Sequence, residues 1–562
     1  MSNSTAVSHR KERINHLKHS TFELLVLGGG ATGAGIALDA ASRGIKTALI
    51  EKSDFASGTS SKSTKLIHGG LRYLKQLDIQ LVRETGTERA ILHGLAPHLV
   101  LPEKMLMPLI KGGNYGYWST SFGLKVYDIL AKVKGDDRRK MLNKKEALKQ
   151  EPLLDDKNLK GAGYYAEYRT DDARLTIELI KSAVRYGASV INYCEGKDFV
   201  YENKKVVGVN CMDTLTGEAI EIKSKTVVSA TGPWVDGLRV KDGSLSNKKL
   251  FLSKGIHIVV PQDKFPLNQT VYFDVPGGRM IFAIPRGRTT YIGTTDTKYK
   301  SDLDHILCTQ NDLNYLLNAV NSVFPNINLT VEDIESNWAG LRPLIHQEGK
   351  SPSEMSRKDE IFESPNGLIS IAGGKLTGYR KMAERIVDIV SDRLKNQTDS
   401  PIKPCTTNNI ALNQNPLKNF TEVKSYIKKL SATLKNIGLD QYHAWYLVTT
   451  YGTMADTIIN GLNDYKEHTP DVALACAEAK FGIEHEYIMT ASDFFVRRTG
   501  RLFFDIVSIP KIRPTVMSLL AKELDWNTER LEEENIALDG WIKDATTFYD
   551  TEKSSQIAMQ ES

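Results

Sequence analysis

Three glycines near the N-terminus have a spacing that suits phosphate binding. Gly28, Gly30 and Gly33 fit the pattern GxGxxG, between the apolar run ELLVL and the small-residue run AGIALDAASRG. In such a turn the first glycine permits the tight bend, the second lets the backbone approach a pyrophosphate, and the third lets the following helix pack on the strand. The N-terminus of that helix adds free N–H groups and a partial positive charge. The pattern therefore predicts a strand–turn–helix unit that binds a dinucleotide.

A carboxylate follows where the ribose of a dinucleotide would need it. A second strand-like run, KTALIE, ends at Glu51, ~20 residues beyond the glycines. A carboxylate at this place accepts hydrogen bonds from ribose hydroxyls and disfavours a 2′-phosphate. The alternative, a glycine turn without chemistry, does not account for Glu51.

The residues after Glu51 favour FAD over NAD. No compact nicotinamide site stands out, and a loop rich in hydroxyl groups and glycines follows at once, at 56–75. Such loops are most often plain surface connections, but this one can wrap a second phosphate and lead the chain to a flat ring. Further along, the run VVSATGPW contains a strand that ends in Ala230, Thr231 and Gly232, small residues that let the backbone lie beside a nucleotide. The hydroxyls of the loop belong to Ser57, Thr59, Ser60, Ser61, Ser63 and Thr64.

Composition excludes several classes of protein. The net charge of +5 is the difference between 73 basic and 68 acidic side chains spread over 562 residues. Nucleic-acid binding usually needs a concentrated basic face, so no nucleic-acid partner is expected. The five cysteines are far apart and never form a CxxC pair, which predicts neither a disulfide framework nor a metal site.

The elements that position these residues read as an α/β protein, α+β overall. Strand and helix patterns alternate early in the chain, strands such as GIHIVV and RMIFAIP alternate with turns between 250 and 340, and the region after the linker NQTDSPIKPC is helical in pattern. We expect a Rossmann-like dinucleotide-binding domain that is discontinuous in sequence, an antiparallel-sheet substrate (cap) domain and a C-terminal helical domain. The expected boundaries are 22–100, 160–250 and 340–397 for the first domain, 101–159 and 251–339 for the cap, and 398–562 for the helical domain.

The N-terminal segment 1–21 is basic and lacks the apolar core of a signal peptide. We interpret it as a solvated tail, with the alternative that it rests on an anionic membrane surface. No run approaches the ~20 apolar residues of a spanning helix. The expected location is the cytoplasm, peripheral on the inner face of the cell membrane.

Longer motifs carry a family resemblance. The segments SGTSSKSTKLIHGGLRYL, YRTDDARLTIELI, ATGPWVD, KGIHIVV, TTDT, WAGLRPL, IAGGKLTGYRKMA and DFFVRRTGRLFF run together with the glycine turn from about residue 22 to 505. The chain resembles the FAD-dependent glycerol-3-phosphate dehydrogenases, within the D-amino-acid-oxidase and glycine-oxidase type of flavoprotein. The resemblance implies oxidation of sn-glycerol 3-phosphate to dihydroxyacetone phosphate, with hydride transfer from C2 to flavin N5, in glycerol catabolism.

The resemblance also implies which residues bind the substrate. Arg72 and Arg342 stand in the motifs GGLRYL and AGLRPL, and the planar fork of an arginine binds phosphate oxygens in pairs. We assign both to the substrate phosphate, helped by Tyr73 and Thr295. A surface salt bridge is the usual role of a single arginine, but the motif positions favour function.

A general base is needed for the proton of the C2 hydroxyl. His257 in KGIHIVV is one candidate, since the ordinary histidine pKa is near neutral; the other reading is a core histidine on a strand. Lys375 in AGGKLTGYR competes with it, as a base, as a group that polarises the hydroxyl, or as a flavin contact.

The remaining assignments concern the cofactor. The turn at AGGKLTGYR joins a strand to a helix whose N-terminus would stabilise negative charge on a reduced flavin. The full set of expected FAD contacts is Gly28, Gly30, Gly33, Glu51, Lys52, Thr59, Ser60, Ser61, Thr64, His68, Gly69, Ala230, Gly232, Gly374, Leu376 and Thr377.

Several partners are left open at this level. The family passes electrons to a membrane quinone or to O2 with release of H2O2, and the absence of a long insertion between the motifs favours quinone. An FAD-dependent enzyme acting on RNA and a non-catalytic flavin-binding protein are the rival classes. A homo-oligomer is compatible with the sequence. The C-terminal region is assigned no chemistry, and Arg497, Arg498 and Arg501 are interpreted as a docking surface.

Overall fold

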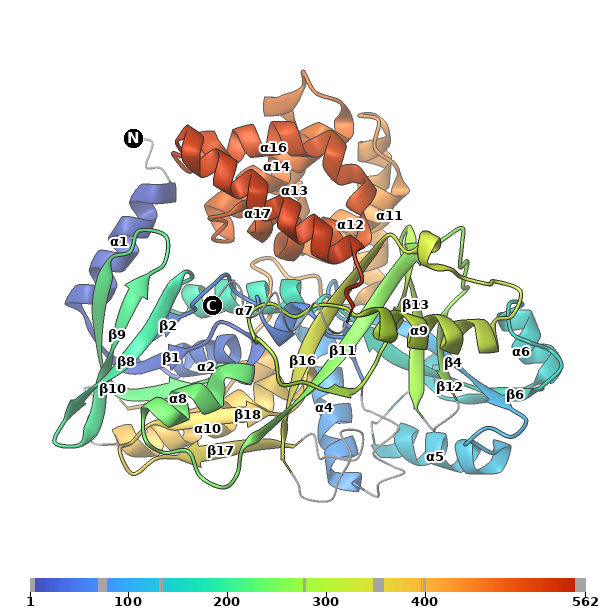
Figure 1. The fold of residues 1–562 in the computed structure, drawn as a ribbon, viewed down its shortest axis with the longest axis horizontal. Helices are drawn as coiled ribbons and strands as arrows, with labels where there is room; N and C mark the ends of the chain where they lie inside the picture. The colour runs from blue at the N-terminus through green and yellow to red at the C-terminus, as the bar shows by residue number, and fades with distance from the viewer. Residues whose placement is uncertain are drawn as a thin grey trace.

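The protein contains two β-sheets, each with helices packed on it, and a group of C-terminal helices (Figure 1). The computed structural model describes residues 6–68, 78–130, 133, 135–275, 279–346, 358–395, 397 and 401–550. Within these ranges, no helix is both long enough and apolar enough to cross a membrane.

The first sheet contains the glycine turn. Its strands run in the order β17-β18-β10-β1-β2-β7, and β1 lies between β10 and β2 with all three parallel. Strand β2 is buried over its whole length, as is typical of a parallel sheet covered by helices. Helix α2 packs between α7 and α10. The bounds are β1 Thr21–Leu27, α2 Ala31–Ser42, β2 Thr47–Ile50, α7 Asp172–Arg185, β7 Ser189–Ile191, β8 Cys194–Glu202, β9 Lys205–Asp213, β10 Ala219–Ser229, α8 Val235–Lys241, β17 Asp359–Glu363, β18 Ile369–Gly373 and α10 Tyr379–Leu394.

The second sheet is almost entirely antiparallel, as the alternation of strands and turns predicts. Its order is β15-β11-β14-β13-β12-β4-β6-β3, with β16 on β11 and β5 on β6; the β12–β4 pair is parallel. The strands of this sheet are β3 Leu66–Ile67, β4 Leu101–Ile110, β5 Lys140–Asn143, β6 Leu159–Arg169, β11 Leu250–Pro261, β12 Thr270–Asp274, β13 Met280–Arg286, β14 Thr289–Gly293, β15 Thr297–Lys298 and β16 Ser336–Ile345. The helices between these strands are α4 Ile79–Leu95, α5 Tyr117–Leu130, α6 Lys144–Gln150 and α9 Gln310–Val323.

Three of the expected domain boundaries fall inside strands of this second sheet. The boundaries between 159 and 160 and between 250 and 251 lie one residue into β6 and β11, and that between 339 and 340 lies in the middle of β16. Strand β16 pairs with β11 from Ser336 to Ile345 without interruption. The chain therefore returns to the first sheet only after β16 has completed its pairing.

The C-terminal region is helical, as predicted, and lies over both sheets at the top of Figure 1. Phe503 and Phe504 share a hydrophobic cluster with Tyr291 and Trp338 of the second sheet. The helices are α11 Phe420–Lys435, α12 Gln441–Tyr451, α13 Ala455–Gly461, α14 Pro470–His485, the π-helical turn η9 Asp493–Arg498, α15 Arg501–Phe504, α16 Ile509–Glu523 and α17 Thr528–Thr546.

The three arginines of the motif DFFVRRTGRLFF are buried, which corrects the docking-surface interpretation. Arg497, Arg498 and Arg501 are only 4%, 1% and 8% exposed. Each forms ion pairs with buried carboxylates inside the molecule. Because the partners are far away in the sequence, the local pattern resembles a basic surface.

The N-terminal segment is a packed helix and not a solvated tail. Helix α1, Ala6–His19, contacts β7 and β10 and buries Ile14 and Leu17. Arg10 donates a hydrogen bond of 2.9 Å to Asp213, whose side chain is fully buried. The expectation of a tail was wrong because this ion-pair partner is more than 200 residues away and no local pattern signals it.

Removal of the Arg10 side chain is expected to destabilise the fold. In Arg10→Met, the buried carboxylate of Asp213 loses its counter-ion, and the free energy of unfolding should fall by about 3–5 kcal/mol. Chemical denaturation followed by circular dichroism measures the change. Lys11→Met, at an exposed neighbouring position, is the control and should change it by less than about 0.5 kcal/mol. Equal stability of the two variants would show that the pair contributes nothing.

Candidate active site

A cavity of about 450 Å³ lies between the two sheets. Residues that follow β1, β2, β10 and β18 line one side of it, so the carboxyl ends of four parallel strands meet there. This is the edge at which open α/β sheets bind their ligands. Residues of β11 and β16 line the other side.

The glycine turn has the geometry that its sequence predicts. Gly28 has φ of 109°, and a Cβ there would lie 2.6 Å from the carbonyl oxygen of Ala230. A Cβ at Gly33 would lie 1.9 Å from the carbonyl oxygen of Gly28. Only glycine therefore fits at this position in the first turn of α2. Gly30 caps α2 and, like Ala31, faces the cavity. The helix N-terminus is therefore open to a ligand phosphate.

Glu51 also faces the cavity, and its carboxylate joins two loops. Oε2 accepts a hydrogen bond of 2.7 Å from the N–H of Gly29, and Oε1 accepts one of 3.0 Å from the N–H of Ser53. Burial raises the pKa of this carboxyl, while the two N–H groups act in the opposite direction. The carboxylate is thus held in one orientation at the end of β2.

The hydroxyl-rich loop lies beside the start of α2 and contacts its first N–H group. The Oγ of Ser60 accepts a hydrogen bond of 3.0 Å from the N–H of Ala31, and the Oγ1 of Thr59 donates one of 2.7 Å to the carbonyl of Leu341 on β16. Thr59 and Ser60 begin the 3₁₀ turn η1, Thr59–Ser61. The loop therefore connects the glycine turn to the second sheet.

A buried ion pair fixes the other end of this loop. The Nζ of Lys65 donates a hydrogen bond of 2.5 Å to Asp172, and the second oxygen of Asp172 accepts one of 3.0 Å from the N–H of Ser63. Both charged side chains are almost completely buried. The segment YRTDDARL at the start of α7 thus serves to hold the cavity loop.

Arg342 lies in the cavity wall on β16, where Gly255 of the neighbouring strand makes room for it. A Cβ at Gly255 would lie 2.3 Å from the guanidinium. The guanidinium donates to Thr294 Oγ1 at 2.8 Å and to the carbonyl of Thr295 at 3.1 Å, and it lies 3.4 Å from Asp296. These contacts hold the planar group flat against β11.

His257 is buried beside the cavity. Its ring stacks on Trp338 with centroids 4.7 Å apart and lies over Gly293, where a Cβ would be 2.1 Å away. Nε2 lies 3.0 Å from the Oγ1 of Thr64, and Nδ1 has no hydrogen-bond partner in the part of the chain that the structure describes. Burial, with the charges of Arg342 and Lys65, moves the pKa of His257 well below its ordinary value. The ring is therefore neutral at physiological pH.

Lys375 lies in the cavity wall, in the segment that connects β18 to α10. It precedes the 3₁₀ turn η5, Leu376–Gly378, which continues into the helix. Gly374 has φ of 77°, and a Cβ there would lie 2.5 Å from the sulfur of Met382. The glycine therefore lets the turn pack on α10.

Most of the site residues expected from the sequence meet in the cavity. Of the described residues, Gly33, Ser61, His257 and Thr295 are not among those that line it. Ser61 and Thr295 are buried, and the Oγ1 of Thr295 accepts a hydrogen bond from the N–H of Ile256. Gly69, Arg72 and Tyr73 lie outside the described residues. The lining residues include Gly28, Gly30, Glu51, Lys52, Thr59, Ser60, Thr64, His68, Ala230, Gly232, Arg342, Gly374, Lys375, Leu376 and Thr377.

Other lining residues were not assigned a contact from the sequence. Lys62 and Ser63 lie in the loop that was expected to wrap the cofactor, whereas Cys194 and Gly196 follow β7 and carry no sequence signal. Burial and the charge of Arg497 lower the pKa of Lys62 to about 8. The glycines in strands β11 and β14 could have been read as places where another group approaches closely.

This arrangement can bind a dinucleotide and a second anion together. The helix N-terminus, the hydroxyls and Glu51 match the parts of a dinucleotide. Arg342 and Lys375 add positive charge to the same cavity.

Comparison with known proteins agrees with this geometry. Residues 23–379 match the family model described as FAD dependent oxidoreductase, and residues 405–531 match the C-terminal domain of alpha-glycerophosphate oxidase. The aerobic glycerol-3-phosphate dehydrogenase of Bacillus subtilis is 49% identical over 95% of this chain and 97% of that protein. That of Staphylococcus aureus (strain MRSA252) is 48% identical over 95% of this chain and 97% of its own length.

Solved structures give the same result. The glycerol-3-phosphate dehydrogenase of Bacillus halodurans, complexed with FAD, superposes with a TM-score of 0.82 at 43% identity, over 97% of this chain and 98% of that one. The L-alpha-glycerophosphate oxidase of Mycoplasma pneumoniae, at 18% identity and a TM-score of 0.53 over 66% of this chain and 95% of that one, shares the fold. The chain therefore belongs to the FAD-dependent oxidoreductase family, together with the aerobic glycerol-3-phosphate dehydrogenases.

Proposed function

We propose that this protein binds FAD in the cavity between its sheets and oxidises sn-glycerol 3-phosphate to dihydroxyacetone phosphate. The observation that carries the proposal is the presence, in one cavity, of a dinucleotide-type wall that includes Lys375 after β18 and of Arg342 on β16 opposite. Near-full-length relatives named for this activity support it.

The wall residues fit FAD. Gly30 and the N-terminus of α2 would hold the pyrophosphate, and Glu51 would accept hydrogen bonds from the adenosine ribose. His68, Leu376 and Thr377 would lie near the flavin. When bound, FAD supplies the acceptor for the hydride of substrate C2 at flavin N5.

Arg342 would bind the substrate phosphate. Its guanidinium is fixed by Thr294, Thr295 and Asp296, and it remains in the cavity wall. Thr295 thus acts through its backbone carbonyl, which positions Arg342. Arg72 and Tyr73 are proposed as further phosphate ligands on the strength of their motif.

Two residues would handle the proton of the C2 hydroxyl. Lys375, in the cavity wall, would contact the C2 oxygen directly. His257 would accept the proton through Thr64, whose hydroxyl faces the cavity and lies within hydrogen-bond distance of Nε2. A histidine must be neutral before it can accept a proton, and the surroundings of His257 keep it neutral, although they also make it a weaker base.

The electrons are proposed to pass to a membrane quinone, as part of glycerol catabolism. Near-full-length relatives at 48–49% identity are named dehydrogenases, while the glycerophosphate oxidase shares only 18% identity. Reaction with O2 is the alternative, and the match of residues 405–531 to the C-terminal domain of an oxidase supports this alternative.

Helix α5 is the proposed contact with the anionic membrane surface. Trp118, Phe122 and Ile129 are 82%, 70% and 67% exposed, and their spacing places them with Lys125 along one side of the helix. Such an apolar stripe with a basic neighbour suits the boundary between headgroups and acyl chains.

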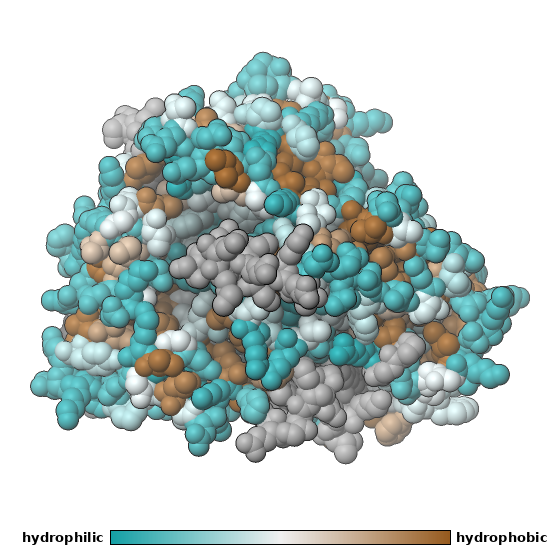
Figure 2. Space-filling model, in the orientation of Figure 1, coloured by the Kyte–Doolittle hydropathy of each residue, from teal (hydrophilic) through white to brown (hydrophobic). Residues whose placement is uncertain are grey.

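The coloured surface in Figure 2 is mostly hydrophilic, with small separate hydrophobic patches. Helix α5 lies far from α1, the segment first considered for this role (Figure 1).

The function is tested by anaerobic titration. Addition of glycerol 3-phosphate to the purified protein should bleach the flavin absorbance bands. Arg342→Met should need at least about tenfold more substrate for half-bleaching, since a lost charged hydrogen bond costs about 1.5–3 kcal/mol. Arg288→Met, which removes an arginine paired with Glu335 outside the cavity wall, should behave like the parent. Flavin that does not bleach in the parent protein would refute the proposed activity.

The two candidates for the base are separated by single-turnover kinetics. In His257→Gln the rate constant of flavin reduction should fall by ~10²–10⁴ with little change in substrate affinity. Because the pKa of His257 is already lowered well below its ordinary value, the parent rate should be level through the ordinary pH range of a histidine titration and decline only in more acidic solution. A His257→Gln rate within a few-fold of the parent, with a loss confined to Lys375→Met, would assign the base to Lys375.

Membrane contact is tested by co-sedimentation with vesicles of anionic phospholipid. The double variant Trp118→Ser, Phe122→Ser should lose most of its vesicle binding and keep its activity with a soluble dye. Val507→Ser together with Ile536→Ser removes side chains of comparable exposure from the C-terminal helices and should bind as the parent does. Equal binding of both variants would exclude α5 as the contact.

A further inference from the structure

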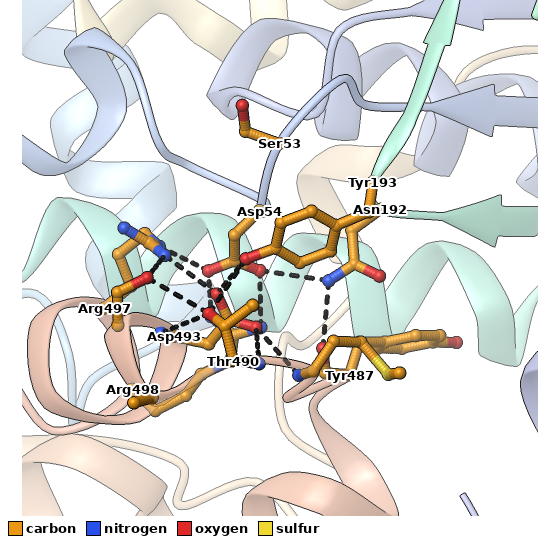
Figure 3. Close-up of polar contacts among 12 residues, drawn as sticks. Ser53, Asp54, Asn192, Tyr193, Tyr487, Thr490, Asp493, Arg497 and Arg498 are labelled. Atoms are coloured by element: carbon orange, nitrogen blue, oxygen red, sulfur yellow. Dashed lines mark hydrogen bonds and ion pairs between the residues drawn. The ribbon is translucent and has the colours of Figure 1, made fainter. Parts of the chain in front are cut away.

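A buried ionic network joins the C-terminal helices to the loop that follows β2 (Figure 3). At its centre is Asp54, three residues after Glu51 and fully buried. Its carboxylate accepts two hydrogen bonds from Arg498, at 2.6 and 2.8 Å, and one from the Nε of Arg497. This bidentate geometry fixes the direction of the carboxylate as well as its charge.

Further contacts hold the arginines in turn. Arg497 donates to Asp493 at 2.8 Å, and the Nε of Arg498 donates to the carbonyl of Glu486 at 2.9 Å. Asp493 accepts a hydrogen bond of 2.6 Å from the hydroxyl of Tyr193. Burial alone would raise the pKa of Asp54, but the two arginines outweigh it and lower the pKa to about 2. Asp54 is therefore charged at physiological pH, whereas burial and the neighbouring charge of Asp54 raise the pKa of Asp493.

The network reaches the cavity through a few bonds. Ser53 donates its N–H to Glu51 and accepts, at its carbonyl, the N–H of Tyr193 at 2.8 Å. Ala56, two residues after Asp54, donates its N–H to the carbonyl of Gly29 in the glycine turn at 3.1 Å. Asp54 thus lies between the two contacts that shape the ribose side of the cavity.

Aromatic packing follows the same direction. Phe55 is fully buried and meets Tyr487 edge-on with centroids 5.5 Å apart. A Cβ at Gly29 would lie 2.6 Å from the Phe55 ring, so the turn rests directly on this side chain. Tyr487 of the C-terminal region therefore packs, through Phe55, against the glycine turn that would contact the cofactor.

We infer that the π-helical turn Asp493–Arg498 is a positioning element of the cofactor site, so that FAD binding and docking of this turn strengthen each other. The inference rests on the proposed binding of FAD. Coupling of this kind is reciprocal: a group that tightens the cofactor is itself tightened by it. Arg497 and Arg498 do not line the cavity and act through the loop Glu51–Ala56.

The test measures FAD release from the holoenzyme by the rise in flavin fluorescence. In Arg498→Lys, which keeps the charge but loses the bidentate pair, FAD should leave on the order of tenfold faster. The KM for glycerol 3-phosphate should stay within twofold, since the substrate wall is untouched. Arg498→Met should show the larger effect, and the milder lysine variant covers the case in which it fails to fold.

Arg501→Met is the matched control. Arg501 is buried in the same segment and pairs with Glu478, but it has no contact with the loop after β2. It should lower thermal stability and leave FAD release within twofold of the parent. Faster release in Arg501→Met to the same extent as in Arg498→Lys, or unchanged release in both Arg498 variants, would overturn the inference.

Limited proteolysis tests the reciprocal direction. Excess FAD should slow tryptic cleavage between Glu486 and Arg501 in the parent at least severalfold, and this protection should shrink in Arg498→Lys. Cleavage that is indifferent to FAD would also overturn the inference. A parent protein that holds no FAD would instead refute the proposed function, so the two failures are distinguishable.

Discussion

Buried ion pairs hold the irregular segment between Glu51 and His68, and the cavity depends on them. This segment contributes a large share of one cavity wall, yet only η1 and β3 within it are regular. Ordering a residue costs about 1–2 kcal/mol of backbone entropy, and a loop without a strand partner gains few hydrogen bonds to offset it. Two carboxylates provide the missing constraint: Asp54 forms ion pairs with Arg497 and Arg498, and Asp172 forms one with Lys65.

The sequence predicts the parts of this fold that depend on neighbouring residues. The glycine turn, the parallel strands around it, the antiparallel strands after residue 250 and the helical C-terminus follow from local spacing and periodicity, and the structure contains all of them. The buried network was beyond reach because Asp54 and Arg498 are separated by 444 positions. The same holds for Arg10 and Asp213, whose pairing turns an apparent tail into a packed helix. A charged side chain looks the same in a sequence whether water or a distant counter-ion receives it.

Glycines on the second sheet show a similar limit. Arg342 and His257 stand in motifs that the sequence singles out, but their room is provided by Gly255 and Gly293 on the adjacent strands. A side chain at either glycine would displace the guanidinium or the imidazole. Placing both groups on strands, and not on loops, fixes their orientation through the register of β11 with β14 and β16.

Three carboxylates that pair with cations near the cavity lie outside its wall, which favours anionic ligands on that side. Asp54, Asp172 and Asp296 each pair with a cation, and none of the three belongs to the cavity wall among the described residues. Arg342 faces the cavity while its partner Asp296 lies away from it, so the pair keeps the guanidinium in place without setting a carboxylate against an incoming phosphate. Because a buried cation without a counter-ion is costly, such pairing from outside the wall lets the site remain positive toward its ligand and stable before the ligand arrives. Burial, together with the charges of Arg342 and Lys65, keeps His257 neutral, so surroundings that would attract a phosphate also keep the proposed proton acceptor in its neutral form.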